Sequence, residues 1–201
     1  MRGAEAVLSR KVLLGRPCVV KTRTVKGYRV KELDGRLRTE RTRSEARLLH
    51  KAKLAGVPCP TVFEVDDFEI TMGFVDGPRP VMDDKDAEEA GVILAKLHAD
   101  DIIHGDYTPA NLISSLTDRT GKRGGGRTLF VIDFGLGFIS KDVEDKAVDV
   151  FTMLRALGDG GKGGSRKSVK EAFLKGYGSY DKASSVLKRV KDVEKRVRYA
   201  V

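Results

Sequence analysis

Cysteine, tryptophan and histidine are scarce in this chain, which has 2, 0 and 3 of them among 201 residues. Two cysteines, Cys18 and Cys59, build neither a disulfide framework nor a cysteine-rich zinc site. Both stand in apolar surroundings. We therefore predict buried free thiols in a reducing compartment, and a cytoplasmic location.

Long apolar runs are also missing. None approaches the roughly 18 residues needed to span a bilayer, so we expect no contact with a membrane. Residues 1–5 do not open a signal peptide, and no apolar segment follows them. The content of 40% hydrophobic and 33% charged residues is typical of a globular protein. The length suffices for one large domain or a small two-lobed unit.

Acidic residues are few at both ends of the chain and concentrated in its middle. Residues 1–60 carry 16 Lys and Arg against 5 Asp and Glu, residues 61–110 carry 3 against 13, and residues 111–201 carry 19 against 11. The basic ends are either solvated faces or surfaces for a polyanion such as RNA. With no aromatic-rich RNA motif, such binding would be driven by phosphates and sensitive to salt.

The pattern of apolar residues and turn signals predicts an α+β protein with two lobes. Residues 1–76 form a β-rich lobe with one long helix, and residues 77–201 form a helical lobe. The expected elements of the first lobe are strands within 4–31, including Tyr28 to Val30, a turn at 15–17, a helix over 37–55, and strands at 61–64 and 68–74. Those of the second are a break at 77–80, a helix over 87–99, strands at 112–113 and 129–132 around a flexible glycine-rich 121–126, a helix over 146–157, a mobile 158–164, and helices to the end.

Two short segments carry the chemistry. The first runs from His104 to Asn111 and reads His-Gly-Asp-Tyr-Thr-Pro-Ala-Asn, and the second is Ile132-Asp133-Phe134-Gly135 after an apolar run. Asp and Asn favour turns everywhere, so each alone could be a capped turn or a strand end. Together, in this order, they are typical of sites that hold nucleotide phosphates through a metal ion. The sequence therefore favours an ATP-using phosphotransferase or ATPase.

The residue types fit distinct tasks in phosphoryl transfer. Asp106 is placed to orient an attacking hydroxyl or accept its proton. Asn111 and Asp133 offer hard oxygen atoms, which suit Mg²⁺. His104 is expected to brace the loop rather than to react.

A cation for the phosphates is also required, and Lys21 is the best candidate. It ends the apolar run Cys18-Val19-Val20 on a predicted central strand, although a solvated strand end remains an alternative. Glu45, on the following helix, is the carboxylate expected to fix it, with Glu40 as a competitor. Lys26 and Lys31 are weaker rivals in polar surroundings. The single candidate for a phosphate loop, Gly3-Ala4-Glu5-Ala6, lacks the three-glycine spacing and could equally be a frayed terminus.

These segments resemble the Bud32 (PRPK) family of small atypical kinases, subunits of the KEOPS complex within the protein-kinase-like superfamily. The resemblance covers nearly the whole chain. The most specific segments are Lys-Gly-Tyr-Arg at 26–29 and Glu-Asp-Lys-Ala-Val-Asp at 144–149. Further matches are Gly-Ala-Glu-Ala at 3–6, Arg-Thr-Arg-Ser-Glu-Ala-Arg at 41–47, His-Gly-Asp at 104–106, the run 132–139, and the basic tail.

The resemblance implies a minimal two-lobed kinase-like fold and a role for each matching residue. Lys21 would hold the α- and β-phosphates of ATP and pair with Glu45, and Asp106 would be the catalytic aspartate. Asn111 and Asp133 would hold Mg²⁺, and Asp149 would brace the catalytic loop by accepting hydrogen bonds from loop amides. Adenine would lie between Val19 above and Ile113 with Ile132 below, and its edge would meet the backbone of Gly73, Phe74 and Val75.

The chain departs from ordinary protein kinases in three places. Gly105 replaces the arginine that reads activation-loop phosphorylation, and Thr108 replaces the lysine that commonly contacts the γ-phosphate. Few residues separate Gly135 from Glu144, so there is no room for an activation segment or an Ala-Pro-Glu motif. This favours ATP hydrolysis or self-phosphorylation over broad protein kinase activity.

The resemblance also implies partners. In this family the ATPase supports threonylcarbamoyl modification of adenosine 37 in tRNA, beside a Kae1-type transferase and a Cgi121-type subunit on the N-lobe. The basic tail, residues 188–198, would lie against the transferase and tRNA, or else form a solvated terminal helix.

Three other readings stay open. A stand-alone kinase of the RIO type and a small-molecule phosphotransferase of the aminoglycoside kind both use His-Gly-Asp with a downstream Asn, but usually depart from Asp-Phe-Gly. A non-catalytic tRNA-binding scaffold would use the basic ends and would have no need of metal ligands.

Overall fold

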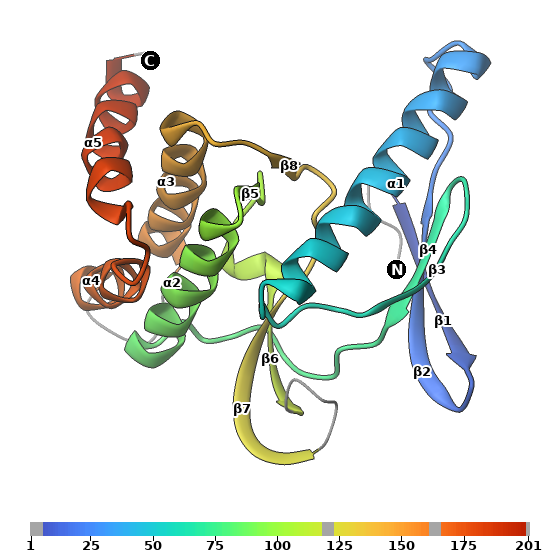
Figure 1. The fold of residues 1–201 in the computed structure, drawn as a ribbon, viewed down its shortest axis with the longest axis horizontal. Helices are drawn as coiled ribbons and strands as arrows, with labels where there is room; N and C mark the ends of the chain where they lie inside the picture. The colour runs from blue at the N-terminus through green and yellow to red at the C-terminus, as the bar shows by residue number, and fades with distance from the viewer. Residues whose placement is uncertain (1–5, 118–122, 161–165, 200–201) are drawn as a thin grey trace.

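The computed structural model describes residues 6–117, 123–160 and 166–199. A four-stranded antiparallel sheet occupies one side of the molecule, in the order β1-β2-β4-β3, and helix α1 packs on β3 and β4 (Figure 1). The elements of this part are β1 (Ala6–Leu13), β2 (Arg16–Arg23), α1 (Lys31–Leu54), β3 (Val62–Val65) and β4 (Glu69–Gly73).

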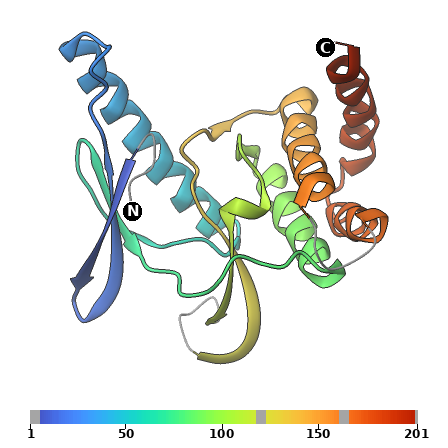
Figure 2. The ribbon, with the colours of Figure 1, turned by 180° about the vertical axis from the view of Figure 1, so that it is seen from behind.

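The rest of the chain is mainly helical and lies on the other side of α1, with the described C-terminal end on α5 (Figure 2). Its elements are α2 (Asp84–Ala99), β5 (Ile102–Ile103), the short helix η1 (Pro109–Asn111), β6 (Leu112–Thr117), β7 (Arg123–Val131), β8 (Phe138–Ile139), α3 (Val143–Gly160), α4 (Arg166–Tyr177) and α5 (Ala183–Tyr199). Strands β6 and β7 pair with each other, and β5 pairs with β8. The predicted α+β class is confirmed. Over the described ranges, no helix combines the length and the apolar content that crossing a bilayer requires.

Helix α1 begins six residues earlier than the sequence pattern predicts. Its first turns lack an apolar stripe, and ion pairs between residues four apart stabilise them instead: Asp34 accepts from Arg38 at 2.7 Å, and Arg36 lies 3.5 Å from Glu40. Acidic side chains in the first turn and lysines in the last turn complement the helix dipole. Gly56, at φ +72°, follows the C-cap and ends the helix.

Three local predictions were wrong. Residues 28–30 form no strand, because a turn bond from the Arg29 amide to the Lys26 carbonyl directs the chain toward α1. Residues 123–126, predicted as a flexible loop, begin β7, and residues 158–160, predicted as mobile, belong to the end of α3. The remaining residues of those two glycine-rich segments lie outside the described ranges.

The helical part is held together by close packing of α2 on α4. A Cβ atom on Gly91 of α2 would lie 2.2 Å from the carbonyl oxygen of Phe173, and one on Gly176 of α4 would lie 2.0 Å from that of Glu88. Only glycine allows backbones to approach this closely. Beside this crossing, Tyr107 of the loop that carries the chemistry donates its hydroxyl group to the carbonyl oxygen of Ala90, at 2.8 Å.

Both cysteines are buried free thiols, as predicted. Burial raises the pKa of the Cys59 thiol to about 12, so this sulfur is an unreactive part of the apolar core.

Candidate active site

A cavity of about 770 Å³ lies between the sheet and the helical part. Its size is in the range of small-molecule sites. Of the residues predicted to form the site, ten line it: Val19, Lys21, Glu45, Gly73, Phe74, Val75, Asp106, Ile113, Ile132 and Asp133. The structure thus brings together residues that are more than 100 positions apart in sequence. Asn111 does not line the cavity, but it contacts Asp106.

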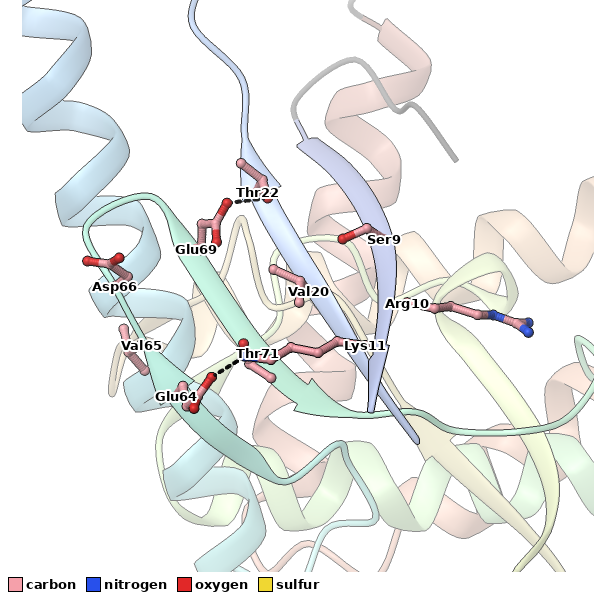
Figure 3. Close-up of a pocket in the computed structure, with 10 residues that line it drawn as sticks. All are labelled: Ser9, Arg10, Lys11, Val20, Thr22, Glu64, Val65, Asp66, Glu69 and Thr71. Carbon is pink, nitrogen blue, oxygen red and sulfur yellow. Dashed lines mark hydrogen bonds and ion pairs between the residues drawn. The ribbon is translucent and has the colours of Figure 1, made fainter. Parts of the chain in front are cut away.

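A second hollow lies on the outer face of the sheet, away from α1 (Figure 3). Two pairs of its polar side chains bond to each other: Lys11 with Glu64 at 2.8 Å, and Thr22 with Glu69 at 2.8 Å. Glu64 is half exposed, and none of the predicted catalytic residues lines this hollow. The chemistry therefore belongs to the first cavity.

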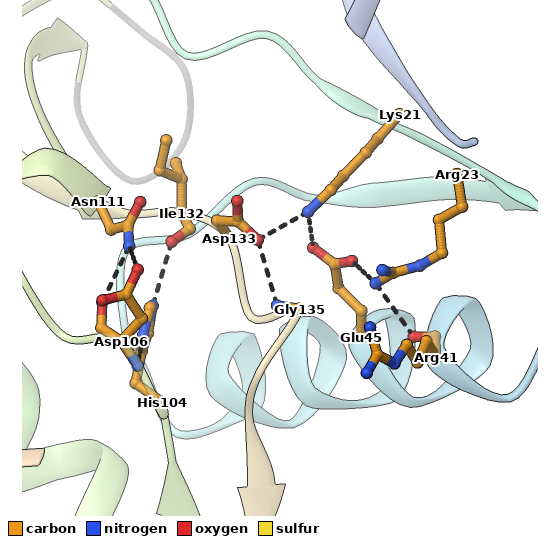
Figure 4. A network of polar contacts seen from close by, with 10 residues as sticks. All are labelled: Lys21, Arg23, Arg41, Glu45, His104, Asp106, Asn111, Ile132, Asp133 and Gly135. Carbon is orange, nitrogen blue, oxygen red and sulfur yellow. Dashed lines mark hydrogen bonds and ion pairs between the residues drawn. The ribbon is translucent and has the colours of Figure 1, made fainter. Parts of the chain in front are cut away.

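The ammonium of Lys21 is the centre of the site (Figure 4). It donates to Oε1 of Glu45 at 2.6 Å and to Oδ1 of Asp133 at 2.7 Å. Lys21 projects from β2 and Glu45 from α1, while Asp133 follows β7. Glu40, the competing carboxylate, pairs with Arg36 on an exposed face instead. The predicted pairing of Lys21 with Glu45 is confirmed.

Arg23 is a member of the site that sequence reasoning missed. It is two residues beyond Lys21 on the same strand, so both side chains point to the same face. Its Nη2 donates to Oε2 of Glu45 at 2.6 Å, and it lines the cavity. In the sequence, only the two-residue spacing from Lys21 indicates that Arg23 belongs to the site. Further lining residues not predicted are Ala6, Leu8, Pro60, Met72, Arg79, Gly135 and Leu136.

The loop after β5 brings Asp106 and Asn111 together. The Nδ2 of Asn111 donates to the backbone oxygen and to Oδ2 of Asp106, at 2.9 Å each. With its nitrogen engaged in this way, Asn111 has Oδ1 as the side-chain atom that could hold a metal ion. The short helix η1, opened by Pro109, sets the five-residue spacing.

A buried carboxylate on α3 binds the backbone of the same loop. Asp149 on α3 accepts the backbone amides of His104 at 2.6 Å and of Gly105 at 2.9 Å. It is 1% exposed, so these hydrogen bonds compensate for its burial. The predicted bracing by Asp149 is confirmed.

His104 is a structural residue of the loop, as expected. Its ring is fully buried, and Nε2 lies 3.1 Å from the carbonyl oxygen of Ile132, which ties the loop of residues 104–111 to the segment of residues 132–135. Burial lowers the pKa of His104, against the smaller opposing effect of Asp149, so the ring is neutral.

Asp133 has a left-handed backbone conformation with φ +65°, which is uncommon for a residue other than glycine. Such strain is concentrated at functional sites. Burial opposes the ionisation of its carboxyl group, but the charge and hydrogen bond of Lys21, with the Gly135 amide, outweigh this and lower its pKa. Asp133 is therefore an ionised carboxylate at neutral pH.

The oxygen atoms at this position fit Mg²⁺. Asp133 uses Oδ1 for its hydrogen bonds to Lys21 and to the Gly135 amide, which leaves Oδ2, and Asn111 keeps Oδ1. Among the described residues there is no cluster of three or more His, Cys, Asp or Glu that could hold a metal alone. Mg²⁺ does not need one, because it is usually held by one or two carboxylates together with substrate phosphates.

The predicted phosphate loop at residues 3–6 lies outside the described residues, apart from Ala6. Ala6 is buried and lines the cavity beside Lys21 and Arg23.

Comparison with solved structures shows a kinase-like fold. The chain aligns over its whole length with the Rio2 kinase from Chaetomium thermophilum, with a TM-score of 0.65, 16% identity and 72% of that chain covered. It aligns over 97% of its length with WaaP in complex with acyl carrier protein, with a TM-score of 0.60, 17% identity and 86% of that chain covered. At these identities the likeness concerns the fold alone.

Comparison with curated sequences identifies closer relatives, although no family model matches. The chain is 37% identical over 189 residues to the probable bifunctional tRNA threonylcarbamoyladenosine biosynthesis protein of Methanosarcina acetivorans, covering 92% of this chain and 32% of that protein. The corresponding protein of Methanocaldococcus jannaschii is 38% identical over 205 residues, covering 98% and 36%. The chain thus spans about a third of these bifunctional relatives.

One relative matches over most of both lengths. The probable serine/threonine-protein kinase BUD32 homolog of Archaeoglobus fulgidus is 39% identical over 183 residues, which cover 90% of this chain and 88% of that protein. The sequence similarity over most of the chain and the kinase-like fold support the same assignment. The chain belongs to the family of Bud32 homologues and has a protein-kinase-like fold.

Proposed function

We propose that this chain is an ATP-dependent atypical serine/threonine kinase and ATPase that acts as the KEOPS subunit supporting threonylcarbamoyl modification of adenosine 37 in tRNA. The observation that carries the proposal is the position of the Lys21 ammonium. It lies between Glu45 and Asp133, in a cavity that also contains Asp106. A cation, a metal-binding carboxylate and a base meet there, as phosphoryl transfer requires.

The apolar part of the cavity is assigned to adenine. Val19 on the sheet side and Ile113 with Ile132 on the helical side provide flat contacts for the base. The backbone of residues 73–75, which follows β4, supplies hydrogen-bonding groups for its edge. Residues 1–76 and 77–201 are proposed as the two lobes, with the nucleotide between them.

The polar part is assigned to the phosphates. Lys21 holds the α- and β-phosphates, with Glu45 fixing its position, and Asn111 and Asp133 hold Mg²⁺. Mg²⁺, when bound, neutralises charge on the β- and γ-phosphates. Asp106 orients the attacking water or hydroxyl group and accepts its proton. The bond from Asn111 holds Asp106 in place.

Hydrolysis or self-phosphorylation is favoured over transfer to diverse proteins. Strand β8 has two residues, and α3 already begins at Val143, so the connection from Gly135 is too short for a segment that grips a protein substrate.

The proposed partners follow from the relatives. The longer relatives are named probable bifunctional tRNA threonylcarbamoyladenosine biosynthesis proteins, and this chain spans about a third of their length. We therefore propose a Kae1-type transferase as partner, with a Cgi121-type subunit on the N-lobe. On α5, Arg189 and Arg196 pair with Glu144 of α3, whereas Lys188, Lys191 and Lys195 are exposed and are proposed to contact tRNA phosphates. The cytoplasmic location stays a prediction.

The test is a measurement of phosphate release from Mg-ATP by the purified chain, with and without its partner transferase and tRNA. Slow release alone and faster release with both additions is the expected result. Intact ATP binding with no response to either addition would contradict the KEOPS assignment. Rapid transfer of the γ-phosphate to a small alcohol would favour a small-molecule phosphotransferase instead.

A further inference from the structure

Two cations, not one, hold the buried carboxylate of Glu45. Lys21 donates to its Oε1 at 2.6 Å and Arg23 donates to its Oε2 at 2.6 Å (Figure 4). Glu45 is 1% exposed and Arg23 is 5% exposed. Both oxygens of the carboxylate therefore accept hydrogen bonds from positively charged side chains at a buried position.

The burial of Arg23 is costly and is not explained by stability. Its Nε is buried and has no hydrogen-bond partner among the described residues, so part of the guanidinium is desolvated without compensation. Buried ion pairs are weak evidence for stability, because well-packed apolar residues often replace them without loss. The position of Arg23 inside the cavity points to a role toward the ligand.

Charge balance defines that role. Lys21, Arg23, Glu45 and Asp133 together carry no net charge. If Asp133 held a metal ion, Lys21, Arg23 and Glu45 would together keep a net charge of plus one, because Arg23 offsets the charge of Glu45. Without Arg23, Glu45 would cancel Lys21, which is the residue that faces the phosphates. Coulomb energies are large at such distances in a poorly solvated site.

Arg23 also fixes α1 to the sheet. Its Nη2 lies 3.5 Å from the Arg41 carbonyl oxygen, one turn before Glu45, and Nη1 of Arg38 lies 3.4 Å from the backbone oxygen of Arg23. A Cβ atom on Gly135 would lie 3.6 Å from Arg23 Nη2 and 3.7 Å from Glu45 Oε2. The ion pair between Arg23 and Glu45 therefore joins β2 to α1 and lies next to the turn at Gly135.

We propose that Arg23 is a positioning residue for nucleotide binding. It neutralises Glu45 through the oxygen that Lys21 does not use, so that Glu45 does not cancel the charge that Lys21 offers to the phosphates, and α1 stays in its binding position. This inference rests on the proposed function of the cavity.

The experiment measures the affinity of the full chain for Mg-ADP by calorimetry. Arg23→Gln keeps a donor for Glu45 but removes the charge, and we expect Kd to rise about tenfold. Arg23→Lys restores the charge and should recover an affinity within about threefold of the wild type. In turnover assays Arg23→Gln should raise KM for ATP much more than it lowers kcat, because the charge acts on bound substrate and transition state alike.

A double-mutant cycle shows whether Arg23 acts through Glu45. In a Glu45→Gln background there is no carboxylate to neutralise, so adding Arg23→Gln should raise Kd clearly less than it does in the wild-type background. This double variant also removes both buried charges, so it is expected to fold even if Arg23→Gln alone does not. The matched control is Arg43→Gln on the exposed side of α1, where Arg43 pairs with Asp67, and it should leave Kd unchanged.

The outcomes separate the two claims. Wild-type affinity in Arg23→Gln, with Mg-ADP bound by the wild type, overturns the role of Arg23 and leaves the proposed function intact. An equal loss of affinity in the Arg23→Lys variant, or an equal effect of Arg23→Gln in both backgrounds, also overturns it. A wild-type chain that does not bind Mg-ADP overturns both.

Discussion

The Cα of Gly105 packs directly against the carbonyl oxygen of Leu136, and a Cβ atom at residue 105 would lie 2.3 Å from that oxygen. Gly105 precedes Asp106 in the loop from His104 to Asn111, and Leu136 follows the turn at residues 133–135. The two loops therefore lie back to back, with no space for a side chain between them. This contact gives a physical reason why the arginine of ordinary protein kinases does not occur here.

Gly105→Ala is predicted to push the two loops apart. Gly105 also has φ +79°, so alanine adds backbone strain to the steric conflict. We expect a loss of about 1–3 kcal/mol in the free energy of unfolding and a marked fall in ATP turnover. Urea unfolding and phosphate release check this. The control is Gly35→Ala in α1, where a Cβ meets nothing within 4 Å and where alanine should stabilise by about 0.5–1 kcal/mol. Wild-type behaviour of Gly105→Ala would rule out the tight contact.

Asp149→Asn is predicted to loosen the catalytic loop. The carboxylate accepts two loop amides with two oxygens, whereas the amide of asparagine would present an N–H group to one of them. Leaving a buried donor unpaired costs about 1–3 kcal/mol of stability. Turnover should fall at least about tenfold, since small displacements of catalytic groups are costly. Asp192→Asn, an exposed change on α5, is the comparison variant, and equal turnover in the two would argue against the bracing role.

The stability of the protein is predicted to decrease as the pH falls below about 6.5. His98 and His104 are both fully buried, and burial is the main cause that lowers the pKa of each below the ordinary 6.5. The unfolded chain then binds more protons than the folded one near and below pH 6.5, so the free energy of unfolding rises with pH there. Asp133, whose pKa is lowered from 3.8, adds a separate loss only near and below pH 4.

Urea titrations between pH 5 and 8 measure this dependence. His98→Gln should reduce the slope, while His50→Gln, an exposed change on α1, should not. A free energy of unfolding that stays constant from pH 8 to pH 5 would show that the buried rings are not held neutral.

Gly176→Ala is predicted to separate α4 from α2. The added Cβ would lie 2.0 Å from the carbonyl oxygen of Glu88, which is backbone and cannot rotate away. Overpacking of this kind costs about 1–3 kcal/mol or more. Thermal unfolding should show a clearly lower Tm, whereas Gly178→Ala, where the nearest backbone atom is 3.1 Å away, should cost less. An unchanged Tm in Gly176→Ala would contradict the packing.

Most residues of the cavity can be predicted from the sequence because short local patterns mark them. A lysine at the end of an apolar strand and an Asp-Phe-Gly turn after another are local signals, and the chain brings them within hydrogen-bonding distance. The bracing role of Asp149 is implied by the family resemblance, and the two loop amides supply the donors that its buried carboxylate needs.

The features that sequence patterns miss depend on long-range contacts. The start of α1 is stabilised by ion pairs of Asp34 and Arg38 rather than by an apolar stripe, so hydrophobic periodicity does not mark it. Strands β5 and β8, of two residues each, exist only because they pair with each other. Arg23 has no local signal beyond its spacing, because its significance comes from a carboxylate on α1.

The most direct test of the central claim is phosphate release from Mg-ATP by the Asp133→Ala variant. The claim is that Lys21, Asp106, Asn111 and Asp133 form one Mg-ATP site. Removal of the Asp133 carboxylate should abolish turnover, measured with the partner transferase and tRNA present, while Asp67→Ala on the exposed end of the sheet should keep it. Turnover at the wild-type rate by a folded Asp133→Ala protein would contradict the account.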